Sequence, residues 1–355
     1  MSSVRQNAIA HKLNLSVATV SRSLANHPSI SIETRARVLQ VADEMGYKGL
    51  SSRAPRGAKG DKKAITVGVL IALQANSSPL ATFPLILRGI HERAALDKVS
   101  VEVNYVDPNE FDPEAWGNVV VRQLRKGTWR GIILVYPYSP KVVEVLAKKT
   151  SVVSTMEDYD NLSIDSIDTN HQTGIIRMVE KLAGLGHKRI GFVNWAYSFP
   201  GHWSAQRFAA YVNGLFTLGI EFNQNWVFNV HKAAPSLSQK EISEQVIRKI
   251  REDRVTAWVC AADHQAYALI ADLQARDIRV PEDCSVTGFD GIEPPPTLRP
   301  VASLSVPSEA IGVAAVARLI NRIKHPKVPK RKILVETEFI EGTTIAPPPS
   351  SVPVA

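Results

Sequence analysis

The chain contains 355 residues, of which 45% are hydrophobic and 21% are charged, and its formal net charge is +8. This length exceeds that of one compact domain, and the apolar content can fill a large core. Because the sequence lacks a run of about 18 apolar residues and an apolar signal segment, we expect a cytoplasmic protein without a membrane span. Cys260 and Cys284 lack the spacing of metal ligands and are expected as buried free thiols.

The positive charge is concentrated in the first part of the sequence. Residues 1–63 contain 11 lysines and arginines against 4 aspartates and glutamates, whereas the other 292 residues contain 31 against 30. A polyanion is therefore the expected partner of this first segment, and a merely basic tail is the alternative.

Residues 9–24, IAHKLNLSVATVSRSL, predict two short helices joined by a tight turn. Asn14 stands where the turn needs a left-handed backbone, and the Ser16 hydroxyl can cap the second helix. The exposed face of this helix combines short side chains with one long cation, as a helix in a DNA major groove requires. Its members are Val17, Ala18, Thr19, Ser21 and Arg22.

A third helix is predicted over residues 32–45, with Ser31 as its N-cap and Gly46 as its stop. The segment that follows, KGLSSRAPRGAKGDKK, has the composition of a linker. The predicted domains are a helix-turn-helix DNA-binding domain (1–47), a hinge or linker (48–63), an effector-binding core (64–342) and a disordered Pro-rich tail (343–355).

From Ile65 onward, short apolar strands alternate with helices. Near-continuous apolar strands are typical of parallel sheets covered by helices on both faces, and about 280 residues exceed one such sheet. We therefore expect an α/β core of two subdomains. Strands are predicted over 65–73, 101–105, 131–135, 151–154, 189–194, 226–230, 257–261 and 285–289. Helices are predicted over 85–96, 171–185, 204–218, 239–252, 264–276 and 308–323.

Several sequence blocks together resemble one known family. The most specific is SVATVSRSL followed by HPSISIETRARVLQVADEMGY, and the later blocks keep the family's order and spacing. These are DTNHQTG (168–174), LGHKRIGFV (185–193), QRFAAYVNGL (206–215) and RVPEDCSVTGFDGIE (279–293). The chain thus resembles the LacI/GalR family of bacterial transcription regulators over about residues 4–342.

The resemblance implies a DNA-binding head, a hinge, and a core of two lobes like the periplasmic sugar-binding proteins. It also implies a homodimer on a pseudo-palindromic operator, whose affinity is controlled by a small effector between the lobes. We expect a repressor with a carbohydrate effector and without a cofactor or metal. Whether the effector releases or promotes DNA binding stays open.

The resemblance also assigns roles in DNA binding. Val17 and Ala18 would contact thymine methyl groups, and Arg22 would bond to a base, typically guanine, with a phosphate contact as the alternative. Arg5 would reach a base edge or the backbone. Phosphate contacts, which position the helix without reading sequence, are expected from Ser16, Thr19, Ser21 and Asn26.

The hinge departs from the family pattern. Family members typically insert a leucine from a short hinge helix into the minor groove. This chain has Pro55 and Arg56 in that region, and proline inside a helix costs about 3 kcal/mol. We therefore expect that leucine wedging is absent or displaced, and that Arg53 and Arg56 make electrostatic or minor-groove contacts instead.

The effector is expected beyond the carboxyl ends of the parallel strands. This rule selects Phe83, Tyr136, Glu157, Trp195, Asp263 and Asp290. By resemblance, Arg207 and Asp290 contact the effector, and an interlobe salt bridge or a helix cap is their alternative role. Asp263 has a helix N-cap as its alternative. The aromatic loop around Trp195 suits stacking on a sugar ring, with lobe packing as the alternative.

An enzyme is the competing functional class. The sequence lacks a phosphate-binding loop, a G-x-G-x-x-G turn, a nucleophile elbow and a His-x-x-x-His pair. We therefore expect no catalytic activity. A small-molecule binding protein that no longer regulates DNA remains a second alternative, because of the unusual hinge and of Ala25, where the family often has asparagine.

Overall fold

The computed structural model describes residues 6–24, 30, 34, 37, 38, 41, 65–72, 83–115, 118–196, 201–230 and 235–350. It divides into two compact units. Unit 1 comprises Met1–Asp168 and Ser308–Ile333, and unit 2 comprises Thr169–Pro307 and Leu334–Ala355. The expected linker over 48–63 and the predicted DNA contacts Arg5, Asn26, Arg53 and Arg56 lie outside the described residues.

The amino-terminal head contains the two expected short helices, α1 (Gln6–Leu13) and α2 (Val17–Leu24). Asn14 has a φ of 54°, as the turn between them was expected to require. Ile9 and Val20 are fully buried and form a small core with Val38. Of the third helix expected over 32–45, residues 34, 37, 38 and 41 are described, and all four are helical.

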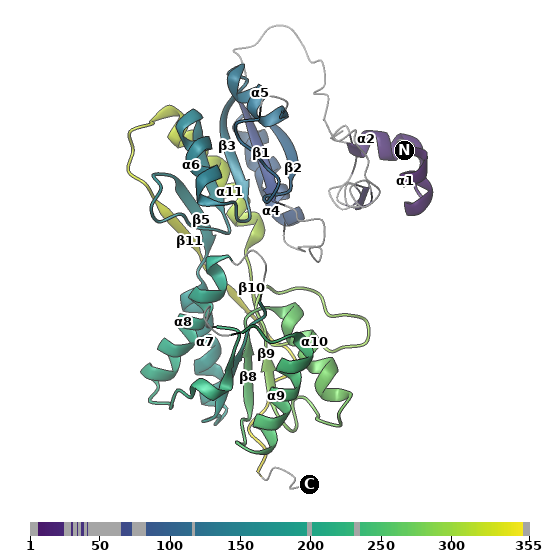
Figure 1. Ribbon diagram of the computed structural model, residues 1–355, viewed down its shortest axis with the longest axis vertical. Helices are drawn as coiled ribbons and strands as arrows, with labels where there is room; N and C mark the ends of the chain where they lie inside the picture. Colours follow the sequence, from purple (N-terminus) through teal and green to yellow (C-terminus); the bar gives the residue numbers. More distant parts are fainter. Residues whose placement is uncertain are drawn as a thin grey trace. The chain divides into compact units, whose positions relative to one another are not determined.

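Unit 1 contains a six-stranded sheet in the order β11-β5-β4-β3-β1-β2 (Figure 1). The pairs from β2 to β5 are parallel, and the central strands are almost wholly buried, as expected from their apolar sequences. The strands are β1 (Thr66–Ala72), β2 (Ser100–Val106), β3 (Trp129–Val135), β4 (Ser151–Thr155), β5 (Asp165–Thr169) and β11 (Lys332–Val335). The helices are α4 (Phe83–Leu96), α5 (Val119–Arg125), α6 (Pro140–Lys149) and α11 (Ser308–Lys324).

The polar strand β5 was not predicted from its sequence, DSIDT. Asp165 is fully buried, and its carboxylate accepts hydrogen bonds from Arg322 Nε at 2.6 Å and Arg318 Nη2 at 3.0 Å. Burial opposes its charge, but these donors and the backbone N–H of Arg331 hold the pKa of Asp165 below its usual value. The paired charges allow a polar segment to form an interior strand.

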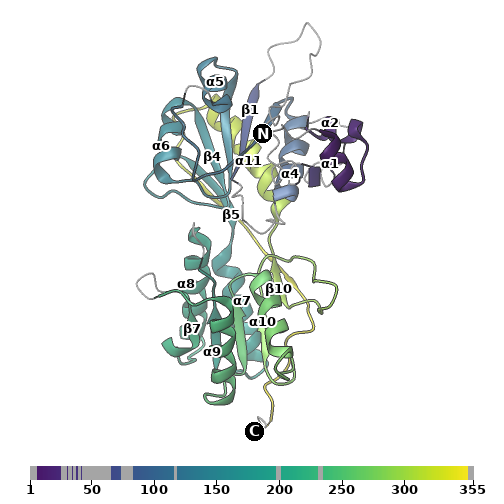
Figure 2. The ribbon, with the colours of Figure 1, turned by 45° about the vertical axis from the view of Figure 1, so that its right-hand side comes forward.

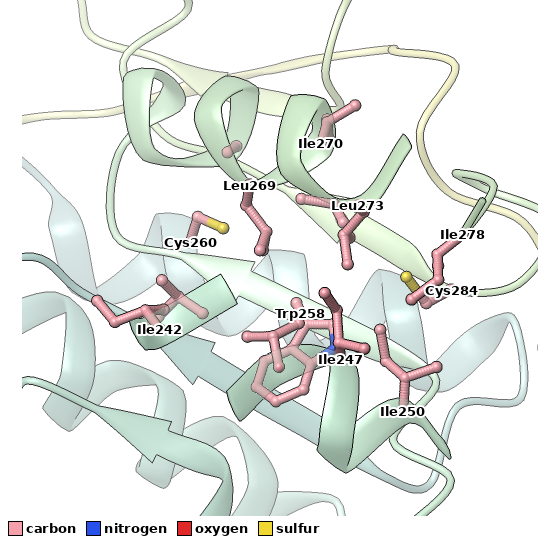
Figure 3. Close-up of a cluster of buried hydrophobic side chains, with 14 of the residues drawn as sticks. Ile242, Ile247, Ile250, Trp258, Cys260, Leu269, Ile270, Leu273, Ile278 and Cys284 are labelled. Atoms are coloured by element: carbon pink, nitrogen blue, oxygen red, sulfur yellow. The ribbon is translucent and has the colours of Figure 1, made fainter. Parts of the chain in front are cut away.

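Unit 2 contains a four-stranded parallel sheet in the order β7-β6-β8-β9, and a two-stranded antiparallel sheet of β10 and β12. Trp258, Cys260, Leu273 and Cys284 lie in its buried core (Figure 3). Both cysteines are free thiols, as expected. The strands are β6 (Ile190–Val193), β7 (Val227–Phe228), β8 (Ala257–Cys260), β9 (Ser285–Thr287), β10 (Ser303–Ser305) and β12 (Glu338–Ile340). The helices are α7 (His171–Gly184), α8 (His202–Thr217), α9 (Gln239–Arg251), α10 (Asp263–Gln274) and the 3-10 turn η1 (Gln224–Trp226).

The Pro-rich segment after residue 342 packs along the free edge of β9. Thr344 is 3% exposed, and its backbone carbonyl accepts from Val286 N at 2.9 Å. Ala346 N donates to Ser285 Oγ at 3.0 Å. The expected disorder is therefore wrong for residues 343–350, because the strand edge supplies hydrogen bonds that prolines do not prevent. Residues 351–355 lie outside the described residues.

The expected α/β core of two subdomains with parallel sheets is confirmed. Helices α5 and α6 and strands β5, β10, β11 and β12 were not predicted from the sequence. None of the described helices combines the length and the apolar character that a bilayer crossing needs.

Helices α4 and α11 of unit 1 touch through two glycines. A Cβ at Gly312 would overlap the carbonyl oxygen of Ile86, and a Cβ at Gly89 would overlap that of Glu309. The two backbones can therefore approach this closely only because neither position carries a side chain.

We predict that Gly312→Ala lowers the free energy of unfolding by about 1–3 kcal/mol, because a methyl group would force these helices apart. The matched control is Gly184→Ala in α7, where a Cβ would meet nothing within 4 Å. That change should be neutral or stabilise by about 0.5–1 kcal/mol. Urea unfolding followed by circular dichroism measures both, and equal effects would contradict the assignment.

Candidate DNA-reading helix and effector site

Helix α2 begins with the cap that the sequence predicted. The Ser16 hydroxyl accepts a hydrogen bond from Thr19 N at 3.0 Å and lies 2.8 Å from Thr19 Oγ1. This cap satisfies one of the unpaired donors at the start of the helix. It fixes where the helix begins and therefore which side chains lie on its outer face.

The outer face of α2 is formed by the residues expected there. Val17 is 42% exposed, so its side chain is available on the outer face of the helix. Ala18, Ser21 and Arg22 are exposed, and Thr19 is half-buried. The opposite face of the helix is buried in the core of the head.

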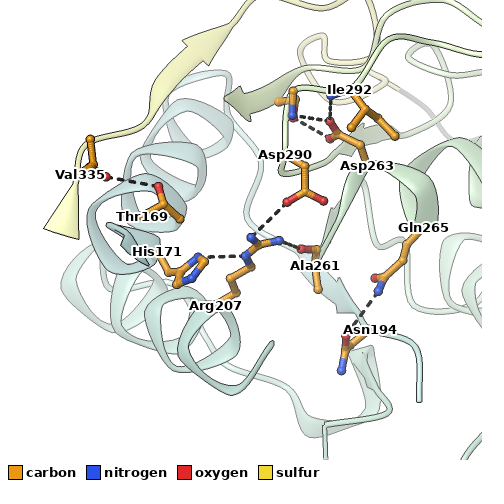
Figure 4. A network of polar contacts seen from close by, with 12 residues as sticks. Thr169, His171, Asn194, Arg207, Ala261, Asp263, Gln265, Asp290, Ile292 and Val335 are labelled. Atoms are coloured by element: carbon orange, nitrogen blue, oxygen red, sulfur yellow. Dashed lines mark hydrogen bonds and ion pairs between the residues drawn. The ribbon is translucent and has the colours of Figure 1, made fainter. Parts of the chain in front are cut away.

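In unit 2, the guanidinium of Arg207 is the centre of a polar network (Figure 4). The residue is only 2% exposed and comes from α8. Its Nε donates to His171 Nδ1 at 3.1 Å, its Nη1 to the carbonyl of Ala261 at 2.5 Å, and its Nη2 to Asp290 Oδ1 at 3.1 Å. The guanidinium carbon also lies 3.6 Å from the ring centroid of Phe289. This cation is therefore held by both hydrogen bonds and an aromatic face.

Asp290 follows β9 in a backbone conformation that L-residues rarely adopt, with a φ of 129°. Its side chain is 21% exposed, so this carboxylate reaches the surface of a mostly buried network. Burial raises its pKa to about 7, although the charge of Arg207 opposes this shift. The negative charge of Asp263 adds to the increase. Asp290 thus changes its charge near neutral pH.

Asp263 holds the loop that carries Asp290. It is fully buried at the start of α10, and one of its oxygens accepts from the backbone N–H groups of Gly291 at 2.7 Å and Ile292 at 2.9 Å. Its other oxygen accepts from Ser303 Oγ at 2.6 Å. The N-cap of α10 is Ala262, so the carboxylate of Asp263 braces the loop and does not cap the helix.

Trp195 follows β6 and is half-buried against the core of unit 2. Its ring meets the His264 ring edge-to-face, with centroids 5.2 Å apart. Burial, with a further contribution from the charge of Arg207, lowers the pKa of His264 to about 4. His264 is therefore neutral at physiological pH, and Trp195 and His264 together form an aromatic wall.

Four of the seven predicted effector residues belong to unit 2 and follow, or lie beside, the carboxyl ends of its strands. They are Trp195, Arg207, Asp263 and Asp290. His171, His264 and Phe289 contact these residues and were not predicted from the sequence. Phe289 and His264 each adjoin a predicted residue in the sequence, which was the only available signal for them.

The other three predicted effector residues belong to unit 1. Phe83 begins α4 and meets Tyr105 edge-to-face, with centroids 6.1 Å apart. Tyr136 directly follows β3 with a φ of 68°, and Glu157 follows β4 as a buried residue. Tyr136 and Glu157 therefore lie at the carboxyl ends of neighbouring strands, as the strand-end rule requires.

A separate hollow of about 450 Å³ lies in unit 2, and none of the predicted effector residues lines it. Arg279 and Glu282 on its wall precede β9, whereas Asp290 follows that strand. The guanidinium of Arg279 is already held by Asp283, with Nη2 and Oδ1 2.8 Å apart. This hollow is thus distinct from the network around Arg207.

Known proteins resemble this chain over most of its length. Residues 7–49 match the family described as bacterial regulatory proteins, lacI family, and residues 179–345 match a periplasmic binding protein-like domain. The chain therefore contains a domain like the DNA-binding domain of the lacI family and a domain like the periplasmic binding proteins. The probable HTH-type transcriptional repressor ExuR of Bacillus subtilis is 25% identical to this chain. The alignment covers 94% of this chain and 95% of that relative.

Solved structures show the same fold. The lac repressor dimer bound to operator and the anti-inducer ONPF has a TM-score of 0.63 at 22% identity, over 97% of this chain and 100% of that one. The complex of the transcriptional regulator CelR with cellobiose has a TM-score of 0.61 at 17% identity. The match covers 96% of this chain and 99% of that one. The LacI family consists of transcription regulators and not of enzymes, which decides between the two functional classes considered from the sequence.

We predict that Asp290→Asn changes how the stability of the protein depends on pH. The raised pKa of Asp290 means that the folded chain keeps a proton that the unfolded chain releases above a pH of about 4. This contribution to stability is complete below that pH and is lost as the pH rises through about 7. The asparagine has no carboxyl group to titrate, so the variant should not lose stability in this way as the pH rises.

Urea unfolding at several pH values between 5 and 8 tests this expectation. The control is Asp277→Asn, which changes an exposed aspartate that also has a positive φ, of 60°. The control should keep the wild-type pH profile. Parallel profiles for wild type and Asp290→Asn would show that Asp290 does not titrate in this range.

Proposed function

We propose that this chain is a transcriptional repressor that binds a pseudo-palindromic operator as a homodimer. The observation that carries the proposal is the Ser16-capped helix α2, whose exposed face consists of short side chains and Arg22. The match of residues 7–49 to the lacI family and the likeness to the probable repressor ExuR support the same function. A regulator of this kind acts on chromosomal DNA, so we place it in the cytoplasm.

The residues of the head would make different kinds of contact with DNA. Val17 and Ala18 contact thymine methyl groups, and Arg22 donates to a base, typically guanine. The hydroxyls of Ser16, Thr19 and Ser21 bond to phosphates and set the register of the helix. Phosphate or minor-groove contacts are also proposed for Arg5, Asn26, Arg53 and Arg56.

We propose a carbohydrate as the effector. Asp290 uses Oδ1 toward Arg207, which directs its other oxygen to accept from a sugar hydroxyl. Trp195 supplies an aromatic face for the sugar ring, and Asp263 acts by holding the Asp290 loop in place. The cellobiose complex of CelR, which has the same fold, supports this class of ligand. Effector contacts by Phe83, Tyr136 and Glu157 of unit 1 remain predictions.

Selection of duplexes from a random library tests the proposed function directly. We predict that the wild-type chain enriches a palindromic sequence. Arg22→Ala should weaken binding to that sequence by about 1–3 kcal/mol, or roughly 10- to 100-fold, and relax the preference at one position in each half-site.

The matched control is Lys12→Ala, which removes one positive charge from an exposed position on α1. It should weaken all duplexes similarly and leave the selected sequence unchanged. Salt-sensitive binding without any enriched sequence would instead favour a binding protein that does not regulate specific genes.

A further inference from the structure

One end of the unit 1 sheet is the end at which the chain arrives from the DNA-binding head. Thr66, the first residue of β1, pairs with Ser100 of β2 and Trp129 of β3, and both pairs are parallel. The starts of all three strands therefore lie at the same end of the sheet. Helix α5 ends three residues before β3, which places its last turn at this end as well (Figure 2).

This end of the sheet carries a cluster of exposed cations, which we call the basic edge. Lys98 lies two residues before β2, and Arg130 is the second residue of β3. The last residue of α5, Arg125, and its C-cap, Lys126, are the other two. The basic edge consists of Lys98, Arg125, Lys126 and Arg130, and each of them is exposed.

Among the described residues, the two carboxylates nearest the basic edge in the sequence accept hydrogen bonds from residues outside it. Residues 98–100 and 122–130 contain no aspartate or glutamate. Asp97 accepts from Arg93 Nε at 2.6 Å, and Glu102 accepts from the indole N–H of Trp129 at 2.8 Å. The basic edge therefore has an excess of positive charge, although the sequence after residue 63 is nearly neutral as a whole.

We propose that the basic edge binds the DNA backbone beside the operator while the head occupies its half-site. The proposal rests on the proposed function, because it needs the head on DNA. The 17 residues 48–64 join the head to this end of the sheet and span at most about 60 Å. Once the head is bound, a tether of this length keeps the neighbouring DNA near the basic edge at an effective concentration on the order of millimolar.

The sequence of the linker indicates what these contacts would add to DNA binding. Pro55 and Arg56 stand where the family resemblance places a hinge helix and a leucine wedge, so at these positions the linker offers charge in place of an apolar wedge. Phosphate contacts by the basic edge would add sequence-independent affinity at the flanks of the operator. Because duplex DNA carries a phosphate every few ångströms, four clustered cations suit it well.

The test compares a duplex of operator length with one that extends about 15 base pairs beyond it on each side, a length chosen to span more than one helical turn. The variant is Lys98→Gln/Lys126→Gln/Arg130→Gln. We expect wild type to bind the long duplex more tightly, with a steeper dependence on salt. The variant should lose that preference, and its log–log salt slope on the long duplex should fall by about 1 for each phosphate that the protein no longer neutralises.

The matched control, Lys240→Gln/Arg248→Gln/Arg251→Gln, removes the same charge from exposed positions on α9 of unit 2. It should keep the wild-type preference for the long duplex. The proposal is overturned if wild type binds both duplexes equally, if the variant keeps the wild-type salt slope, or if the control weakens binding as much as the variant does. Failure of the proposed function is seen separately, as the absence of any enriched operator with the wild-type chain.

Discussion

The buried guanidinium of Arg207 is the group on which the proposed effector site of unit 2 depends. It joins α7 through His171, the end of β8 through the Ala261 carbonyl, and the loop after β9 through Asp290. A charge that is almost completely buried must keep these partners, since removing one partner of a buried ion pair costs about 3–5 kcal/mol. The cation therefore fixes three elements in one geometry before any ligand arrives.

Two aspartates that bond to arginines have pKa values shifted in opposite directions. Asp165 in unit 1 has two arginines and a backbone N–H as donors, and its pKa stays below the usual value. Asp290 in unit 2 has Arg207 alone, with the charge of Asp263 nearby, and its pKa rises to about 7. For Asp165 the charged donors outweigh the effect of burial, whereas for Asp290 burial has the larger effect. Asp290, which is partly exposed and incompletely compensated, is the one suited to bind a ligand.

Sequence reasoning predicted those parts of the fold in which local pattern and environment agree. The apolar runs of β1, β3 and β8 predicted interior strands, and the Ser16 cap predicted the start of α2. The strand β5 was missed because its stability comes from Arg318 and Arg322, which lie more than 150 positions away in the sequence.

The site was predicted in part for a similar reason. The rule that ligands bind beyond strand ends located Trp195 and Asp290, because it needs only the strand positions. It could not reveal that Asp263 braces a loop, since that role depends on the backbone N–H groups of Gly291 and Ile292 in three dimensions. The tail was misjudged because proline content reports on regular structure and not on packing.

The central claim is that Asp290, held by Arg207, binds a sugar. A thermal-shift screen of sugars and nucleosides on wild type, Asp290→Ala and the control Asp277→Ala tests it most directly, because a bound ligand stabilises the folded state. Both substituted positions have a positive φ, of 129° at Asp290 and 60° at Asp277. The account predicts that at least one sugar raises the melting temperature of wild type and control but not of Asp290→Ala. A sugar that stabilises all three equally, or a screen in which only nucleosides bind, would contradict it.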